Sequence, residues 1–227
     1  MDVDGTLQSG SSRCHILTVK CAVKFIGLLI ICSWLSYIYI SEVSGRYGNI
    51  MKVHTSGASC LTAGRNNVSN CGIPASEKIA KNDLENMNKY KKLIKDVGKK
   101  LHIDPAVIAG VISRETRAGA TLNDGWGEKD NTFGLMQIYK ENHTSEEAWN
   151  SKEHIFQGTQ ILVDMIEAIQ KKFPMWTKEE QLKGGIAAFN VGPSRIMNSF
   201  AVDVSTSNND YASDVVARAK YFKSHGY

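Results

Sequence analysis

The chain has 227 residues, a formal net charge of +4 and an ordinary globular composition in which 42% of residues are hydrophobic. That length is enough for one substantial domain or two small ones. The mild positive charge suits an anionic polymer such as a bacterial wall. The sequence has no run of lysines and arginines and no pattern of stacking aromatics, which argues against nucleic acid binding.

The first 45 residues read as a leader. Lys20 and Lys24 precede an uncharged, mostly apolar run from Phe25 to Ile40, and Val43-Ser44-Gly45 follows as a cleavage site. A membrane-spanning helix usually needs about 20 such residues, so this run is short for a span and fits a signal-peptide core. We therefore expect residues 1–45 to be a signal peptide with a polar leader. Residues 46–227 would then be secreted, with no membrane contact after cleavage; an uncleaved anchor is the alternative.

Cysteine usage agrees with secretion. Three cysteines lie in or before the apolar run and would be lost on cleavage: Cys14, Cys21 and Cys32. Cys60 and Cys71 remain, and in a secreted protein such a pair is expected to form a disulfide. Two thiols without a histidine at useful spacing make a poor metal site, so no metal is expected. Asn67 and Asn142 each begin a glycosylation sequon.

Hydrophobic spacing predicts helices in the first half of the mature chain. An apolar helical stripe runs from Ile79 to Leu101. A second helix is expected to begin at Asp104-Pro105, because Asp caps free amides and Pro suits the first helical position, and to stop near Gly119. Residues 123–132 read as a loop or short hairpin, and residues 133–139 as a short strand.

Three more helices are expected in the second half. Apolar spacing from Glu153 to Phe173 is helical, and Pro174 ends it. Thr177-Lys-Glu-Glu180 is a capping box that opens the next helix. A last helix runs from about Asp210 to Lys223. With no repeats and no domain linker, the sequence predicts a single α+β domain, mainly helical, with a small β element.

Glu115 interrupts an apolar stripe. Ile108, Val111 and Ile112 recur at helical spacing, and the next position on that stripe is Glu115. A carboxylate with apolar residues behind it is either a paired structural group or a general acid with a raised pKa. In the structural interpretation it pairs with Arg114, Arg117 or a backbone amide.

Four segments together carry a family resemblance: Ser113-Arg-Glu115, Gly134-Leu-Met-Gln137, Ala188-Phe-Asn190 with Gly192, and Asp210-Tyr-Ala212. In order and spacing the chain from about residue 46 to residue 227 resembles the goose-type lysozymes, and more distantly the soluble lytic transglycosylases. The resemblance implies a lysozyme-like fold that cleaves the β-1,4 bond between N-acetylmuramic acid and N-acetylglucosamine. It implies a monomer without a cofactor, acting on peptidoglycan or a chitin-like oligosaccharide. Glu115 falls on the family's proton donor, which fits its apolar backing.

The second carboxylate of such an enzyme is harder to assign. An inverting glycosidase needs a base to orient the attacking water. The family has two acidic positions for this purpose, and they correspond to Glu128 and Tyr139. Tyr139 can hydrogen-bond a water but supplies no negative charge at neutral pH. Glu128 is therefore the remaining candidate base; the alternative is a solvated loop charge beside Lys129.

Five further positions correspond to substrate contacts in the family: Gln137, His143, Phe189, Asn190 and Tyr211. The amides of Gln137 and Asn190 would hydrogen-bond N-acetyl groups or hydroxyls, and Tyr211 offers a ring face and a hydroxyl. Phe189 stands where the family usually has Tyr, so it keeps a stacking surface and loses one hydrogen bond. His143 could equally be a plain surface histidine, and Phe189 a core aromatic.

Two departures from the family bear on stability and activity. The cysteine pair of a second family disulfide corresponds to Arg46 and His102, so a whole bridge is missing and no orphan thiol remains. Tyr139 and Phe189 leave three functions open. These are a secreted peptidoglycan hydrolase, a lytic transglycosylase that needs only one Glu, and a wall-binding protein without catalysis.

Overall fold

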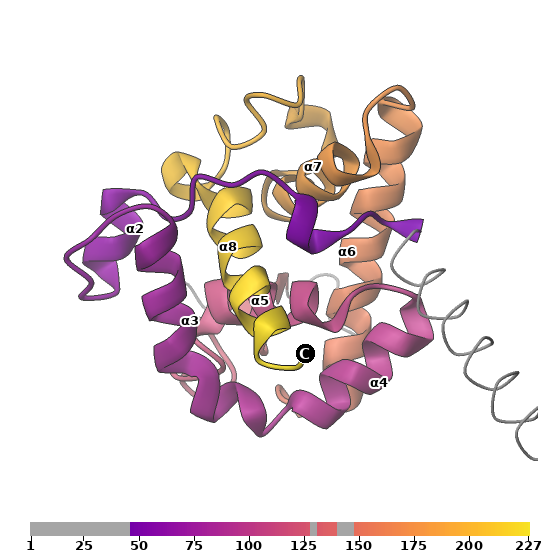
Figure 1. The fold of residues 1–227 in the computed structure, drawn as a ribbon. Coiled ribbons are helices and arrows are strands. Elements are labelled where there is room, and N and C mark those ends of the chain that lie inside the picture. Colours follow the sequence, from indigo (N-terminus) through magenta and orange to yellow (C-terminus); the bar gives the residue numbers. More distant parts are fainter. Residues whose placement is uncertain (1–45, 128–130, 140–147) are drawn as a thin grey trace, which may run out of the picture. The chain divides into compact units, whose positions relative to one another are not determined.

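The computed structural model describes residues 46–127, 131–139 and 148–227, all within one compact unit that spans residues 43–227. In these ranges it has seven α-helices and a two-stranded antiparallel sheet (Figure 1), which confirms the expected mainly helical α+β class. No helix in the described ranges combines the length and apolar character that a bilayer crossing requires. The expected leader, residues 1–45, lies outside the described residues.

The polar segment before the first expected helix holds two short elements. The 3-10 helix η1 spans Ile50–Lys52, and α2 spans Cys60–Arg65. The hydroxyl of Ser59 caps α2 by accepting a hydrogen bond from the Thr62 amide. The apolar stripe from Ile79 to Leu101 then divides into two helices, α3 (Ile73–Asn88) and α4 (Lys91–Leu101), because the chain turns at residues 89 and 90.

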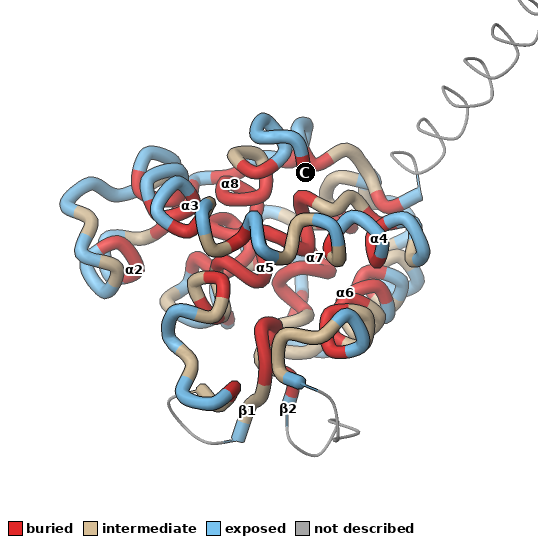
Figure 2. Tube along the Cα trace, turned by 90° about the horizontal axis from the view of Figure 1, so that it is seen from below, coloured by how far each residue is buried: buried red, intermediate tan, exposed pale blue. Residues whose placement is uncertain are grey.

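Helix α5 (Pro105–Thr116) runs through the centre of the domain. Asp104 caps it as predicted, accepting a hydrogen bond from the Ala106 amide at 3.0 Å. Every residue from Ala106 to Ser113 is buried, so α5 is enclosed on all sides and has no single apolar stripe. Helices α3 and α8 (Tyr211–Ser224) pack against it, and buried residues concentrate around this contact (Figure 2).

Gly110 allows α5 and α8 to approach closely. A Cβ atom at this position would lie 2.8 Å from the carbonyl oxygen of Val215 and 3.0 Å from the Cβ of Ala219. The absence of a side chain therefore sets the distance between the two helices that carry most of the polar groups described below.

The remaining helices close the domain. Helix α6 (Lys152–Lys172) packs against α4 and α7, and α7 (Lys178–Val191) begins with the predicted capping box of Thr177 and Glu180. Two 3-10 turns, η3 (Pro193–Arg195) and η4 (Ser207–Asn209), lie between α7 and α8. The three helices predicted in this half are confirmed, with ends that differ from the prediction by one residue.

The β element is a tight hairpin and not the single strand expected over residues 133–139. Strand β1 (Thr132–Phe133) pairs with β2 (Ile138–Tyr139), with Thr132 opposite Tyr139 and Phe133 opposite Ile138. Gly134 and Gln137 both have positive φ, 75° and 50°, and so reverse the chain between the strands. Glycine adopts this conformation freely, whereas a Gln there is uncommon.

The positions of the missing second disulfide have other roles. The guanidinium of Arg46 pairs with the Glu167 carboxylate at 3.2 Å on the surface. His102 ends α4 in the left-handed conformation, with φ 56°.

Cys60 and Cys71 form a disulfide, as expected, across 11 positions of sequence. It holds α2 against the start of α3, where Ala58 and Gly72 also form an antiparallel bridge. Helix α2 carries Thr62, whose hydroxyl accepts a hydrogen bond from Arg114 of α5 at 3.2 Å. The disulfide therefore fixes a helix that supports the centre of the domain.

Replacing both Cys60 and Cys71 with Ser should lower the free energy of unfolding by about 3 kcal/mol, the loop-entropy value for a ring of this size. Denaturant unfolding of the two proteins measures the difference. Peptide mapping without reduction should find the two cysteines linked in the secreted wild-type protein. Two cysteines that alkylate without reductant would contradict both the link and the secretory prediction.

Candidate active site

Glu115 is the second-last residue of α5, at the point where the buried helix reaches the surface. Helix α5 ends at Thr116, three residues before Gly119, because Arg117 takes the left-handed conformation with φ 53°. The Thr116 hydroxyl donates to the carbonyl of Leu135 at 3.0 Å and so ties this helix end to the hairpin segment. The Glu115 side chain is partly buried, and its carboxylate accepts a hydrogen bond from the Tyr211 hydroxyl of α8.

Burial raises the pKa of the Glu115 carboxyl above the usual range for Glu. The Tyr211 hydrogen bond and the charges of Arg114 and Arg218 act in the opposite direction and offset only part of this rise. Within the described residues no ion pair includes Glu115. The carboxyl is therefore held in its protonated form to a higher pH than an exposed Glu would be.

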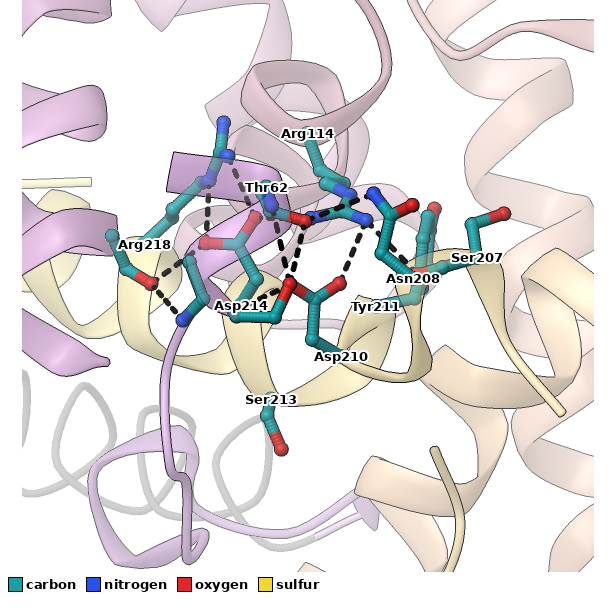
Figure 3. Close-up of polar contacts among 12 residues, drawn as sticks. Thr62, Arg114, Ser207, Asn208, Asp210, Tyr211, Ser213, Asp214 and Arg218 are labelled. Atoms are coloured by element: carbon teal, nitrogen blue, oxygen red, sulfur yellow. Dashed lines mark hydrogen bonds and ion pairs between the residues drawn. The ribbon is translucent and has the colours of Figure 1, made fainter. Parts of the chain in front are cut away.

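The arginines flanking Glu115 are committed to other carboxylates (Figure 3). Arg114 bonds Asp214 at 2.6 Å and Asp210 at 2.9 Å, both on or beside α8. The guanidinium of Arg218 lies against the same Asp214 carboxylate at 2.6 Å. Burial alone would raise the pKa of Asp214, but the charges and hydrogen bonds of Arg218 and Arg114 outweigh it, and the pKa is lowered.

The third arginine turns toward α3. Arg117 Nε lies 2.5 Å from the buried carboxylate of Asp83, and its Nη1 donates to the Asn66 side chain at 2.7 Å. The Ser113 hydroxyl also donates to Asp83, at 2.6 Å. Arg114, Arg117 and Arg218 together with Asp83, Asp210 and Asp214 thus form a neutral Arg–Asp network. Of the partners that the structural interpretation offered for Glu115, which were Arg114, Arg117 or a backbone amide, neither arginine forms an ion pair with it in the described ranges.

Two adjoining hollows meet at Glu115. The larger has a volume of about 490 Å³ and the smaller about 160 Å³. Four residues line both: Glu115, Thr132, Gln137 and Tyr139. Among the described lining residues, Glu115 is the only carboxylate, and most of the others offer amides, hydroxyls or guanidinium groups. The combined cleft can take an extended polar chain with Glu115 near its middle.

Gln137 lies on the cleft surface but its amide is engaged within the hairpin. Its Oε1 accepts a hydrogen bond from the Thr132 hydroxyl at 2.6 Å, and its Nε2 donates to the Gly134 carbonyl at 2.9 Å. Each amide atom retains capacity for one further hydrogen bond. The structure therefore orients this side chain firmly toward the cleft.

The end of α7 forms the wall of the smaller hollow. Phe189 and Asn190 line it together with Ile161 of α6. Phe189 is also partly buried against the core. Its ring therefore packs as a core aromatic and also lines the hollow, where a sugar could contact it. The Asn190 Oδ1 accepts hydrogen bonds from the Ser207 amide at 2.9 Å and the Ser207 hydroxyl at 3.1 Å, which leaves its NH₂ group to face a ligand.

The two tyrosines of the site differ in exposure. Tyr139 is 58% exposed on β2 and lines both hollows. Tyr211 is only 1% exposed, so its ring face is packed in the core and its hydroxyl reaches the site through Glu115. The Arg114 guanidinium lies 5.4 Å from the centre of the Tyr211 ring. Tyr211 is therefore placed to hold the carboxyl and not to stack on a sugar.

The cleft lining differs in part from the expected set of site residues. Glu128 and His143, like the sequon residue Asn142, lie outside the described residues. The structure adds Thr132, Asn66 and Asn208 to the lining of the larger hollow. Thr132 follows a Gly- and Asn-rich loop and carries no sequence signal of its own. In the described ranges, no group of three or more His, Cys, Asp or Glu side chains is suited to hold a metal ion.

The sequence of this chain is similar to those of known proteins. The family model for lysozyme g matches residues 47–226. Lysozyme g of Casuarius casuarius is 55% identical over 184 residues, which cover 81% of this chain and 100% of that protein. Lysozyme g of Gallus gallus is 54% identical over 184 residues, covering 81% and 87%. Lysozyme g-like protein 2 of Homo sapiens is 46% identical over 183 residues, covering 81% and 82%.

The raised pKa of Glu115 predicts a pH-dependent effect on stability. Between the ordinary pKa of 4.5 and the raised value, the folded protein binds a proton that the unfolded chain releases, so this carboxyl lowers stability as pH rises through that range. Glu115→Gln removes the proton equilibrium. The melting temperature of the variant minus that of the wild type should therefore increase from pH 4.5 upward.

Thermal melts at a series of pH values measure this difference. Glu85→Gln, at an exposed position of α3, is the matched control and should show no comparable trend. If the melting temperature of Glu115→Gln minus that of the wild type stays constant or falls as pH rises, the pKa of the Glu115 carboxyl is not raised.

Proposed function

Because this chain belongs to the lysozyme g family of glycoside hydrolases, we propose that it is a secreted enzyme that cleaves the β-1,4 bond between N-acetylmuramic acid and N-acetylglucosamine in bacterial peptidoglycan. The observation that carries the proposal is the position of Glu115. It is a partly buried carboxyl with a raised pKa, and it lies where two polar hollows meet. Residues 1–45 would serve as the signal peptide of the secreted protein.

Glu115 acts as the general acid in this proposal. Because its pKa is raised, this carboxyl keeps its proton to a higher pH than an exposed Glu would, and it can donate that proton to the glycosidic oxygen as the bond breaks. The Tyr211 hydroxyl then stabilises the carboxylate that remains, since it already donates a hydrogen bond to the same group. The neutral Arg–Asp network supports this chemistry because its arginines are compensated and do not pair with the acid.

Glu128 would be the base that orients the attacking water in an inverting reaction. Such a base stands about 6.5–9.5 Å from the acid, across the scissile bond. Tyr139 lines the cleft at the family's other acidic position, and its hydroxyl would help to hold the water. Gln137 and Asn190 would hydrogen-bond the sugars, Phe189 would contact a sugar ring, and His143 would lie at the rim.

Tyr139 also favours a second candidate, a lytic transglycosylase. That reaction uses one Glu and the muramyl 6-hydroxyl as the nucleophile, so an acid at position 139 would be unnecessary. Mass spectrometry of digested peptidoglycan separates the alternatives. Reducing ends indicate hydrolysis, 1,6-anhydro ends indicate transglycosylation, and intact polymer indicates a protein that only binds the wall.

Glu115→Gln should lower wall lysis by at least about a hundredfold, the scale of general acid catalysis, because it removes the transferable proton at nearly constant shape. Turbidity of a bacterial wall suspension measures the rate, and circular dichroism checks the fold. Glu85→Gln is the matched control and should lyse at the wild-type rate. Undiminished lysis by folded Glu115→Gln protein would overturn the assignment.

Tyr139→Asp should raise the rate of hydrolysis, with little change in wall binding, since the new charge acts mainly on the attacking water. Because the Tyr139 ring is 58% exposed, its loss should leave no large cavity and the melting temperature should change little. Reducing-end release and melting temperature are measured on one sample. The gain should vanish when Glu115→Gln is added. If Tyr139→Asp folds normally but releases reducing ends no faster than the wild type, the missing charge at position 139 does not limit hydrolysis.

A further inference from the structure

Exposed apolar side chains gather in one part of the chain. Of the eight large hydrophobic residues that are exposed in the described ranges, the four most exposed all lie between positions 175 and 204. They are Phe200 at 98%, Met175 at 94%, Met197 at 73% and Val204 at 68%. No other exceeds 58%. Single exposed apolar residues are normal, but a gathering of nearly bare ones marks an interaction surface. Val204 lies three positions before Ser207, which lines the larger hollow, so we call only Met175, Met197 and Phe200 the apolar tip.

Two loops bring the tip together near the start of α7. Met175 lies in the short turn between α6 and α7. Lys172, at the end of α6, donates to the carbonyl of Ile196 at 2.8 Å and so holds the second loop beside that turn. The Ser199 side chain hydrogen-bonds Glu180 in the first turn of α7. Both loops lie at the upper edge of the domain, beside α7 (Figure 1).

The tip lies away from the proposed active site. The second loop runs back along α7, and the Ser207 amide reaches Asn190 at the far end of this helix, where the smaller hollow lies. A helix of 14 residues is about 21 Å long. The tip and the cleft therefore lie near opposite ends of α7, and a surface docked on the tip would leave the cleft open.

The charge around the tip is positive where it faces solvent. Four basic residues there are exposed: Lys171, Lys172, Lys178 and Arg195. The acidic residues are partly buried and bound to backbone amides: Glu179 to Asn49 at 3.0 Å, Glu180 to Thr177 at 2.8 Å, and Asp203 to Ala212 at 2.7 Å. These carboxylates keep their charge, but the four basic residues outnumber the three acidic ones, so the rim has a small positive excess, which complements an anionic surface.

We propose that the apolar tip and its basic rim dock on an anionic lipid bilayer, in contrast to the absence of membrane contact that the sequence led us to expect. Apolar side chains on a short, protruding surface insert at the boundary between headgroups and acyl chains, and Lys and Arg beside them are attracted to anionic headgroups. The two methionines adapt to an irregular surface, and Phe200 supplies the largest apolar area. The protein remains water-soluble and binds reversibly, in addition to its action on polysaccharide.

Sedimentation of the mature protein with vesicles tests the proposal. Vesicles of equal parts phosphatidylglycerol and phosphatidylcholine should bind it, and vesicles of phosphatidylcholine alone should bind it much less. Phe200→Ser and Met175→Ser should each weaken binding on the order of tenfold, as expected for losing a buried apolar side chain. Lys171→Gln combined with Lys178→Gln should weaken binding to the anionic vesicles and reduce its dependence on salt.

Leu61→Ser is the matched control, because Leu61 is 55% exposed on α2, away from the tip. It should bind as the wild type does, and all these variants should keep the wild-type rate on isolated peptidoglycan. No binding to anionic vesicles overturns the proposal, and so does an equal loss in Leu61→Ser. A protein that self-associates through Phe200 without vesicles, shown by analytical ultracentrifugation, overturns it as well. Since rates on peptidoglycan are read separately, failure here leaves the proposed hydrolase untouched.

Discussion

The contact between α5 and α8 depends on the buried Arg–Asp network. Arg114 on α5 and Arg218 on α8 share the carboxylate of Asp214, each at 2.6 Å, and all three side chains are largely or completely buried. Removing one partner of such a group leaves an uncompensated buried charge and costs about 3–5 kcal/mol. Any other arrangement of the two helices would leave at least one of these buried charges without a partner, so the network favours this arrangement. Thr62, Asn66 and Asp83 extend the same constraint to α2 and α3.

This network decides how Glu115 can behave. A carboxyl beside two arginines would ordinarily ionise and form an ion pair, with a lowered pKa. Here Arg114 and Arg117 are already bound to aspartates, so burial is the dominant influence on Glu115 and its pKa rises. Tyr211 stands one turn before Asp214 and two turns before Arg218 on α8, so the network also fixes the hydroxyl that holds Glu115. The ionic core and the acid are parts of one arrangement.

The cleft is assembled from segments that are distant in sequence. The end of α5, the hairpin and the end of α7 each contribute one wall, and α2 adds polar groups at the far side of the larger hollow. Backbone geometry fixes the hairpin wall, because Gln137 adopts a positive φ and ties its amide to Thr132 and Gly134. Phe189 serves the core and the cleft at once. Helix ends and the hairpin therefore position Glu115, Gln137 and Asn190.

The sequence by itself determined the helices with strong end signals, the fold class and the position of Glu115 on a helix with apolar surroundings. Asp104, Thr177 and Glu180 act locally, through bonds to backbone amides a few residues away, so their effect can be read from the chain. Only the tertiary structure decided which partners Arg114 and Arg117 choose, since those carboxylates lie 34 or more positions away. It also divided the 79–101 stripe and the 133–139 segment, where a turn depends on packing and not on local pattern. The tertiary structure also decided the raised pKa of Glu115, because that rise comes from burial between helices that meet only when the chain has folded.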